Sequence, residues 1–300
     1  MTKKLFKPIA LFFVVFSWIL STTCILAADD LKVALAAEPT SMDPHYQNLT
    51  INNSFATQIY NALVLQDVNQ NLVPGLASSW KPVDDRTWEF ALRKNVQFHN
   101  GSAFTSEDVI ASMERAANVP NSPSSFATFT KGKKFEIVDD FTIRISTEKP
   151  YPFTPNDMSR ISIIDSAFAK ATTEDFNTGV ASHGTGPFTL TKWLPGDLIE
   201  IARNKNYWGQ PMEWDRIIVK PIKDGTTRTA ALISGDVDFI ERVAPSDLPT
   251  LEKRQNISVF KSVSNRLLYM TLHMTDNPVK PYVTDKNGTP IGSPFKDIRM

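Results

Sequence analysis

Few residues in this sequence of 300 amino acids are spaced as catalysis would require. Ser293-Pro294-Phe295-Lys296 fits the Ser-x-x-Lys pattern of secreted penicillin-interacting hydrolases, in which the serine is the nucleophile. That serine would have to begin a helix, whereas here it is followed by a proline and preceded by a glycine. Lys223-Asp224-Gly225 only faintly matches the accompanying Lys-Thr-Gly, and no Ser-Asp-Asn occurs. A serine hydrolase is therefore an alternative of a different class, and we do not favour it.

Metal chemistry and acid–base chemistry have no better support. The four histidines lie far apart without the spacing of metal ligands: His45, His99, His183 and His273. The pairs Asp84-Asp85 and Asp139-Asp140 are typical of turns and surfaces rather than of paired catalytic carboxylates. The sequence also lacks a Gly-x-Ser-x-Gly elbow, a Walker A loop and a His-Glu-x-x-His helix. We predict a protein that is not an enzyme and that needs no cofactor or metal.

The first 28 residues have the layout of a secretory signal peptide. Lys3, Lys4 and Lys7 precede an apolar run from 9 to 20, and Leu26-Ala27-Ala28 follows as a cleavage site. The run is too short for a comfortable membrane anchor. We therefore predict cleavage after Ala27 or Ala28 and a periplasmic protein.

The sole cysteine, Cys24, lies inside this leader. A lipoprotein signal has a leucine and small residues before its lipidated cysteine, whereas Ser21-Thr22-Thr23 precede this one. Lipid anchoring at Cys24 is thus the less favoured alternative. Cleavage beyond it would leave a chain without disulfides, which an oxidising compartment does not affect.

Composition narrows the remaining possibilities. The chain is 42% hydrophobic and 21% charged, as in ordinary globular proteins. Its formal charge is +0, and removing the leader's lysines gives about −3, so a nucleic-acid partner is not indicated. About 270 remaining residues are enough for two lobes.

Periodicity predicts a mixed α/β protein. Helices are expected at 51–65, with Asn52, Asn53 or Ser54 as cap, at 106–118 with Thr105 as cap, and at 165–171, 226–234 and 247–254. Strands are expected at 31–35, 87–92, 96–98, 134–138, 141–146, 161–164, 188–193, 198–203, 216–221, 237–240, 257–263 and 267–273. Gly184 and Gly186 suit unusual backbone φ angles, and Pro195-Gly196 predicts a hairpin turn.

Six segments, in this order along the chain, carry a family resemblance. They are residues 55–63, 76–80, 96–109, the Gly-Thr-Gly-Pro-Phe to Tyr-Trp-Gly stretch at 184–209, the Leu-Ile-Ser-Gly-Asp-Val-Asp segment at 232–241, and 294–299. Together they resemble the family 5 solute-binding proteins, which are the dipeptide, oligopeptide and nickel receptors of ABC importers. The resemblance implies a two-lobed periplasmic-binding-protein fold of type II, cluster C. We interpret the segments at 184–209 and 232–241 as scaffold that does not touch the ligand.

The resemblance also implies a domain map. After the signal peptide at 1–28, residues 29–58 and 179–265 would form the sheet subdomain of lobe I, and 59–178 an inserted subdomain. Lobe II would begin within 266–300. Because family members are longer, we expect the 300 residues to be an amino-terminal fragment that contains lobe I essentially complete.

By the same resemblance, ligand contacts fall on positions that line the cleft in relatives. Asn48 and Thr50 follow the Asp43-Pro44-His45 landmark, while Ser124 takes a position that is aromatic elsewhere. The remaining candidates are Phe126, Arg160 and Tyr269. The residues that would identify the solute lie mostly in lobe II.

The predicted function is a monomeric periplasmic receptor that binds an oligopeptide or similar small solute between two lobes. It would deliver the solute to the permease subunits of an ABC transporter. A receptor of the same fold for nickel chelates, sugars or opines is the alternative, and a non-transporting interaction protein is a further one.

Overall fold

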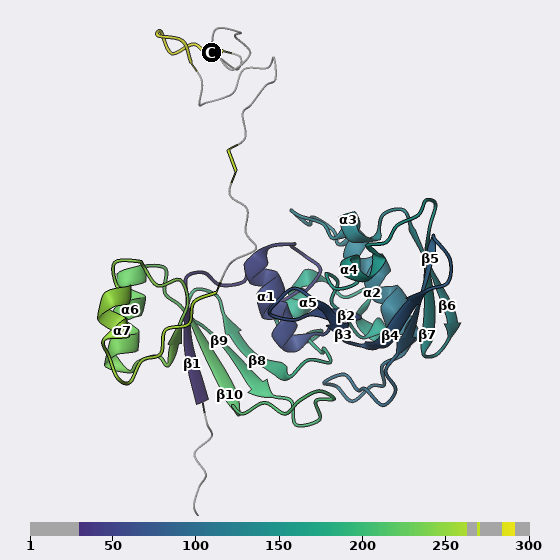
Figure 1. Ribbon diagram of the computed structural model, residues 1–300, viewed down its shortest axis with the longest axis horizontal. Helices are drawn as coiled ribbons and strands as arrows, with labels where there is room; N and C mark the ends of the chain where they lie inside the picture. Colours follow the sequence, from purple (N-terminus) through teal and green to yellow (C-terminus); the bar gives the residue numbers. More distant parts are fainter. Residues whose placement is uncertain (1–29, 263–268, 271–283, 292–300) are drawn as a thin grey trace, which may run out of the picture. The chain divides into compact units, whose positions relative to one another are not determined.

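The computed structural model describes residues 30–262, 269–270 and 284–291 (Figure 1). The predicted leader with Cys24, His273, and the Ser293–Lys296 pattern lie outside these residues, as does most of the predicted strand 267–273. The chain divides into two compact units, Met1–Asp247 and Leu248–Met300. All the geometry below belongs to the first unit unless the second is named.

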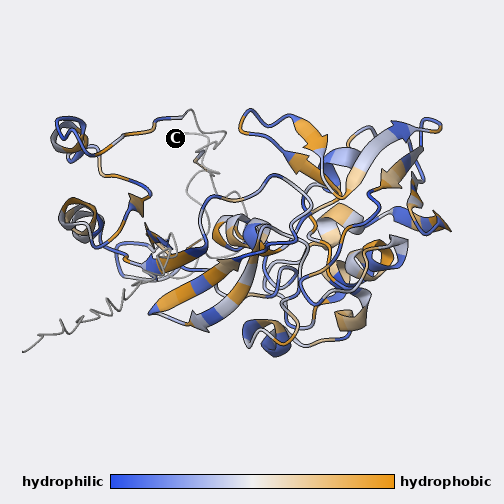
Figure 2. Ribbon diagram, turned by 90° about the horizontal axis from the view of Figure 1, so that it is seen from below, coloured by the Kyte–Doolittle hydropathy of each residue, from blue (hydrophilic) through white to orange (hydrophobic). Residues whose placement is uncertain are grey.

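A mixed five-stranded sheet forms one half of the first unit, in the order β11-β1-β10-β9-β8. Strand β1 lies between β11 and β10 and runs parallel to both, while β8, β9 and β10 are antiparallel neighbours. The strands are β1 (Asp30–Leu35), β8 (Phe188–Leu194), β9 (Leu198–Arg203), β10 (Arg216–Pro221) and β11 (Phe239–Ile240). Figure 2 shows both apolar and polar residues along the strands, but the alternation is interrupted in β10, where Ile217, Ile218 and Val219 follow one another. Gly196, with φ 80°, makes the predicted turn between β8 and β9.

Helix α1 (Thr50–Ile59) packs against this sheet. Phe55 and Ile59 share a buried core with Phe188, Ile199 and Ile201. The helix is shorter than the predicted 51–65 because the chain becomes extended at Tyr60, and the Ile59 carbonyl accepts the Gly186 N–H at 2.9 Å. The predicted cap was also wrong: the helix begins after Leu49, and the Asn52 side chain donates instead to Thr40 Oγ1 at 3.0 Å.

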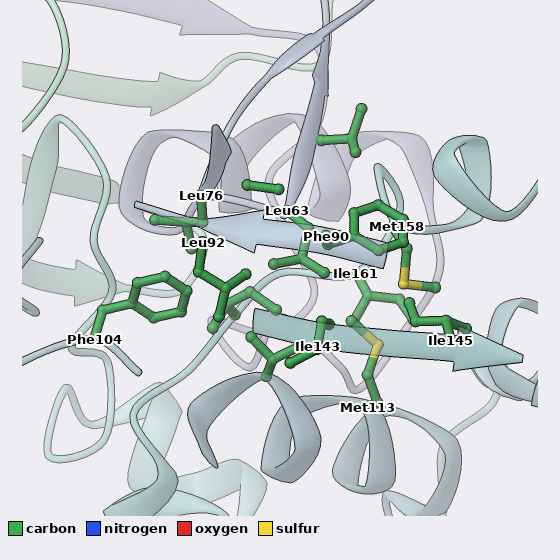
Figure 3. Close-up of a cluster of buried hydrophobic side chains, with 14 of the residues drawn as sticks. Leu63, Leu76, Phe90, Leu92, Phe104, Met113, Ile143, Ile145, Met158 and Ile161 are labelled. Carbon is green, nitrogen blue, oxygen red and sulfur yellow. The ribbon is translucent and has the colours of Figure 1, made fainter. Parts of the chain in front are cut away.

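A four-stranded antiparallel sheet, in the order β4-β5-β7-β6, forms the other half. Its strands are β4 (Ala77–Pro82), β5 (Thr87–Leu92), β6 (Lys133–Asp139) and β7 (Thr142–Thr147). Helix α2 (Ser106–Asn118) packs on one face, where Met113 meets Ile143, Ile145 and Phe90 in the core (Figure 3). The β6–β7 hairpin was predicted, whereas β4 was not, because only Ala77 is buried along it and the strand shows no clear alternation.

The start of α2 confirms the expected cap. Thr105 and Asp108 form a capping box, and the Asp108 carboxylate accepts the Thr105 N–H at 2.8 Å. Short elements connect the two sheets. They are the hairpin of β2 (Val64–Gln66) and β3 (Leu72–Pro74), α3 (Ala127–Thr130), α4 (Thr154–Asp157), the 3₁₀ turn η1 (Ser166–Phe168) and α5 (Thr173–Asn177).

Several predicted elements are reduced or missing. Residues 96–98 and 161–164 make only isolated bridges, Gln97 with Ala103 and Ser162 with Ala62, because no long strand lies beside them. The helix predicted at 165–171 is only the 3₁₀ turn η1. Helix α6 (Gly225–Ser234) agrees with its prediction. In the second unit, α7 (Leu248–Glu252) forms, but 257–262 is not a strand because no described segment pairs with it.

The segment Gly184-Thr185-Gly186, which we call the glycine strap, crosses the end of α1. A Cβ atom on Gly184 would lie 2.0 Å from the Ile59 carbonyl oxygen, and one on Gly186 would lie 2.6 Å from it. Neither glycine has a positive φ, so the expectation of an unusual backbone angle was wrong. Close approach of two backbones is what requires glycine at both positions. The predicted subdomain boundaries themselves remain a prediction.

Candidate ligand-binding groove

An open groove of about 690 Å³ runs along α1. One wall is formed by the exposed side of this helix, including Thr50, Ser54 and Gln58. The opposite wall is the segment from Ser159 to Ser162, which follows α4, and Asn61 and Tyr207 also line the groove. The groove therefore joins parts of the chain that are about a hundred residues apart.

The described lining of the groove carries a single charge. Arg160 is exposed and is the one charged residue among the groove's described lining, which otherwise offers mainly hydroxyls and amides. No described side chain forms an ion pair with its guanidinium. A guanidinium without an ion-pair partner can bind a carboxylate through two parallel hydrogen bonds, and the neutral groups around it can bind other polar atoms of the same ligand.

A buried ion pair joins α2 to the segment that precedes α1. The guanidinium of Arg115, on α2, donates to both carboxylate oxygens of Asp43 at 2.7 Å. The side chains are 6% and 0% exposed, so the pair is almost fully removed from water. The Thr173 hydroxyl donates to the same carboxylate at 2.8 Å, and the guanidinium lies 4.4 Å from the Phe176 ring. Although burial opposes ionisation, these hydrogen bonds hold the pKa of Asp43 below its usual value.

His45 continues this network towards the opposite wall. Its Nδ1 lies 3.2 Å from Arg115 Nη1, and its Nε2 lies 2.7 Å from the Ser162 carbonyl oxygen. Arginine can only donate, so Nδ1 is the acceptor and Nε2–H donates to Ser162. Burial, helped by the neighbouring Arg115 charge, lowers the pKa of His45 to about 4. The ring is therefore neutral at pH 7.

Four of the residues predicted from the sequence gather around the groove and the loop beside it. Thr50 and Arg160 line the groove directly. Asn48 lies two residues before α1, and its side-chain oxygen accepts from Asn53 Nδ2 at 2.8 Å. The Asn48 N–H donates to the Ser124 carbonyl at 2.9 Å, so the loop containing Ser124 lies against the start of α1. Their roles as ligand contacts remain a proposal.

The other two predicted residues are placed differently. Phe126 is 1% exposed and packs against His45 with ring centroids 6.3 Å apart. A ring so deeply buried cannot contact a solute in this conformation, so it belongs to the core and not to the groove. Tyr269 belongs to the second unit and is 79% exposed. Its predicted place in the cleft is therefore untested.

The sequence reasoning missed the Asp43–His45–Arg115 cluster as a functional unit. A signal for it was nevertheless present in α2, where Asp108, Ser112 and Arg115 are spaced by four and three residues along one helix face. All three are buried. A polar stripe on the inward face of an amphipathic helix indicates buried polar partners elsewhere in the chain.

The described part of the chain contains neither a metal-binding cluster nor a membrane-spanning helix. No three histidine, cysteine or acidic side chains there come together as a metal site would require. No described helix has the length and apolarity needed to cross a bilayer.

Comparison with known families places the fold. Residues 71–300 match the bacterial extracellular solute-binding proteins, family 5. The glutathione-binding protein GsiB of Pectobacterium atrosepticum is 29% identical over 255 residues, covering 84% of this chain and 49% of the relative. The GsiB of Escherichia coli strain K12 is 28% identical over 264 residues, with 86% and 51% covered. The chain thus spans about half the length of these relatives.

Solved structures agree. The periplasmic binding protein DppA of Helicobacter pylori, in complex with the peptide STSA, is 25% identical and superposes with a TM-score of 0.69, covering 76% of this chain and 50% of DppA. NikZ of Campylobacter jejuni, in complex with Ni(L-His), is 26% identical with a TM-score of 0.68, covering 77% and 46%. These likenesses confirm the predicted periplasmic-binding-protein fold. The chain belongs to the bacterial extracellular solute-binding proteins of family 5.

Proposed function

We propose that this chain provides the solute-binding lobe of a periplasmic receptor for an ABC importer. In this proposal the groove along α1 holds a small peptide or similar solute, a second lobe closes over it, and the closed form delivers it to the permease. The receptor acts by binding and performs no reaction. The signal-peptide layout of residues 1–28 supports export to the periplasm, which cell fractionation would test.

The observation that carries the proposal is the unpaired Arg160 in an otherwise uncharged groove. A peptide, glutathione or a metal–histidine chelate carries at least one carboxylate, and a guanidinium recognises it with two parallel hydrogen bonds. Amide and hydroxyl groups from Asn53, Ser54 and Gln58 can bind the remaining polar groups of such a solute. We therefore propose that the solute is anionic or zwitterionic.

The relatives support this class without naming the solute. Proteins with the same fold are named for glutathione, or were solved with a peptide or with a nickel–histidine complex. Each of these solutes carries a carboxylate. A neutral sugar could accept hydrogen bonds from Arg160 but would offer no charge to pair with it, so the sugar alternative is the one that the groove favours least.

The test is a binding screen on the full-length protein. Dipeptides, reduced glutathione, the nickel–histidine chelate and a neutral disaccharide would be compared by thermal shift and then by calorimetry. A solute at a hundredfold excess over Kd should stabilise the protein by about 2.7 kcal/mol. Absence of a shift with every solute would overturn the receptor proposal.

Arg160→Gln sharpens this test. The substitution removes the charge while keeping a polar side chain, and we expect at least a tenfold weaker affinity for the carboxylate solutes. Arg86→Gln is the matched control, because Arg86 is exposed and its contact with Asp85 at 3.5 Å lies away from the groove. Equal affinity of the wild type and Arg160→Gln would remove Arg160 from the site.

A further inference from the structure

The buried side chain of His45 links the two walls of the groove without lining it. His45 precedes α1 by five positions, and its Nε2–H donates to the Ser162 carbonyl at 2.7 Å. Ser162 also makes an isolated bridge with Ala62, and Ile163 N–H donates to the Asn61 carbonyl at 2.9 Å. The ring of His45 is fully buried, so it acts on the groove only through the backbone that it holds.

The hydrogen bonds of His45 are fixed by the groups that face each nitrogen. From α2, the Arg115 guanidinium faces Nδ1. From its own segment, the Asp43 carboxylate accepts the His45 backbone N–H at 3.0 Å and carries a charge that Arg115 already neutralises. The Ser162 carbonyl and the edge of Phe126 contribute no net charge.

Tyr60 is the remaining titratable group near this cluster. Burial raises the pKa of its phenol well above the ordinary value, so it stays neutral. Only one neutral tautomer of His45 therefore satisfies both ring nitrogens, and a second proton on Nδ1 would point at a cation.

We propose that His45 is a positioning residue which, as the Nε2–H tautomer, sets the separation between α1 and the Arg160 wall of the groove. That the separation affects solute binding rests on the proposed receptor function, whereas the effect of His45 on the separation does not depend on that function. Protonation at Nδ1 would set its N–H against the Arg115 guanidinium, and the displacement of the ring away from that charge would pull on the Ser162 segment that Nε2–H holds. The wall should then move relative to α1.

The experiment measures this separation without any solute. Nitroxide labels are attached at Thr57→Cys, on the exposed side of α1, and at Phe153→Cys, which is 59% exposed at the start of α4. Cys24→Ser removes the one native cysteine, so the labelling is unambiguous. Electron–electron distance distributions of the full-length protein are recorded at pH 7 and at successive steps down to pH 4.

Three variants decide the outcome. In the wild type we expect a narrow distribution at pH 7 that broadens or shifts as the pH approaches 4. His45→Gln places an uncharged amide donor near Ser162, so its distribution should stay narrow at both pH values. His45→Phe keeps a planar aromatic ring but has no donor, so its distribution should be broad already at pH 7. His99→Gln, at a partly buried imidazole away from the groove lining, should keep the wild-type response.

The proposal is overturned if His45→Phe leaves the distribution narrow. It is also overturned if the response to acid survives in His45→Gln. Should His45→Phe fail to fold, the comparison of the wild type with His45→Gln still decides. Because no solute is present, a failure here is distinct from a failure of the receptor proposal, which the binding of glutathione and dipeptides tests separately.

Discussion

His45, which is buried, and His99, which is partly buried, are two neutral histidines that use the same tautomer for different purposes. His99 Nε2 donates to the Gly186 carbonyl at 3.0 Å and its Nδ1 accepts the Gly184 N–H at 3.2 Å, so it clamps the glycine strap onto the scaffold. His45 also donates from Nε2 to a carbonyl, but its Nδ1 accepts from a charged guanidinium. One imidazole therefore lies between backbone groups, and the other lies in an ionised cluster.

The difference shows how scaffold and groove are separated in this lobe. The strap region is built from backbone contacts that leave no room for a Cβ atom. Its glycines belong to one of the segments that carry the family resemblance. The His45 region is built from side chains that are far apart in the chain: Asp43, Arg115, Thr173 and the Ser162 backbone. Substitutions in the two regions should therefore fail in different ways.

The largest effect is expected at the strap. Gly184→Ala would bring a Cβ atom to 2.0 Å from the Ile59 carbonyl oxygen, where two backbone segments would have to separate. We expect a loss of more than about 4 kcal/mol in the free energy of unfolding, or no folded protein, measured by urea denaturation.

Gly225→Ala is the matched control for this prediction. Gly225 begins α6, and the nearest atom to its added Cβ would be an Arg228 side-chain nitrogen at 3.7 Å. The substitution should be neutral or stabilise the protein by about 0.5 kcal/mol. Similar losses for Gly184→Ala and Gly225→Ala would contradict the account of the strap.

Breaking the Arg115–Asp43 ion pair should cause the second largest loss in the free energy of unfolding. Arg115→Met leaves the Asp43 charge buried without its partner, and we expect a loss of about 3–5 kcal/mol. Adding Asp43→Asn to this variant should restore part of the stability, because the uncompensated charge is removed. Denaturation of both variants would show this, and an equal or greater loss in the double variant would count against it.

Arg216→Met provides the comparison with an exposed pair. Arg216 bonds Asp30 at 2.5 Å, but its side chain is 44% exposed, so water and salt weaken the interaction. Its loss should be much smaller than that of Arg115→Met.

Acid should then separate the two histidines. The pKa of each is lowered to about 4, by burial together with the Arg115 charge for His45, and by burial together with the nearby His183 for His99. Between the ordinary value of 6.5 and about 4, the unfolded chain binds protons that the folded chain does not. Stability should therefore fall as the pH drops through this window, by up to about 3 kcal/mol for His45.

The measurement is the free energy of unfolding at several pH values for the wild type, His45→Gln and His99→Gln. Each variant should have a shallower dependence on pH than the wild type, and only His45→Gln should abolish the change in groove width. An unchanged slope in both variants would show that neither ring is protonated in this window.

The smallest effect is expected at the edge of the strap. Trp208 Nε1–H and the Thr185 hydroxyl both donate to Asn61 Oδ1 at 3.0 Å. Trp208→Phe removes one of these donors while keeping an aromatic ring over Arg93, so the loss should be about 1 kcal/mol. A loss as large as that of Arg115→Met would mean that the indole packs more tightly than its partly buried position indicates.

The sequence predicted most of the fold where one physical signal was dominant. Apolar residues alternate along β5, and the Thr105–Asp108 capping box marks the start of α2. Helix α1 was predicted too long because its end is set by a tertiary contact, the approach of Gly186 to the Ile59 carbonyl. Local periodicity contains no information about such a contact.

The groove was predictable only in part, for a similar reason. Thr50 and Arg160 came from the family resemblance, and both line it. Phe126 was proposed from the same resemblance, as an aromatic residue close to Ser124, but its ring is 1% exposed and packs in the core. Residue type alone does not distinguish an aromatic ring of the core from one of a binding site. The pairing of Asp43 with Arg115 spans 72 residues, and no short motif encodes a partner at that distance.

A structure of the full-length protein with its tightest-binding solute tests the central claim most directly. Among dipeptides, glutathione and the nickel–histidine chelate, the solute with the largest thermal shift would be co-crystallised. The account predicts its carboxylate in the groove along α1, within hydrogen-bonding distance of the Arg160 guanidinium, with the His45 bond to Ser162 intact. A solute bound elsewhere, with Arg160 still free, would contradict it.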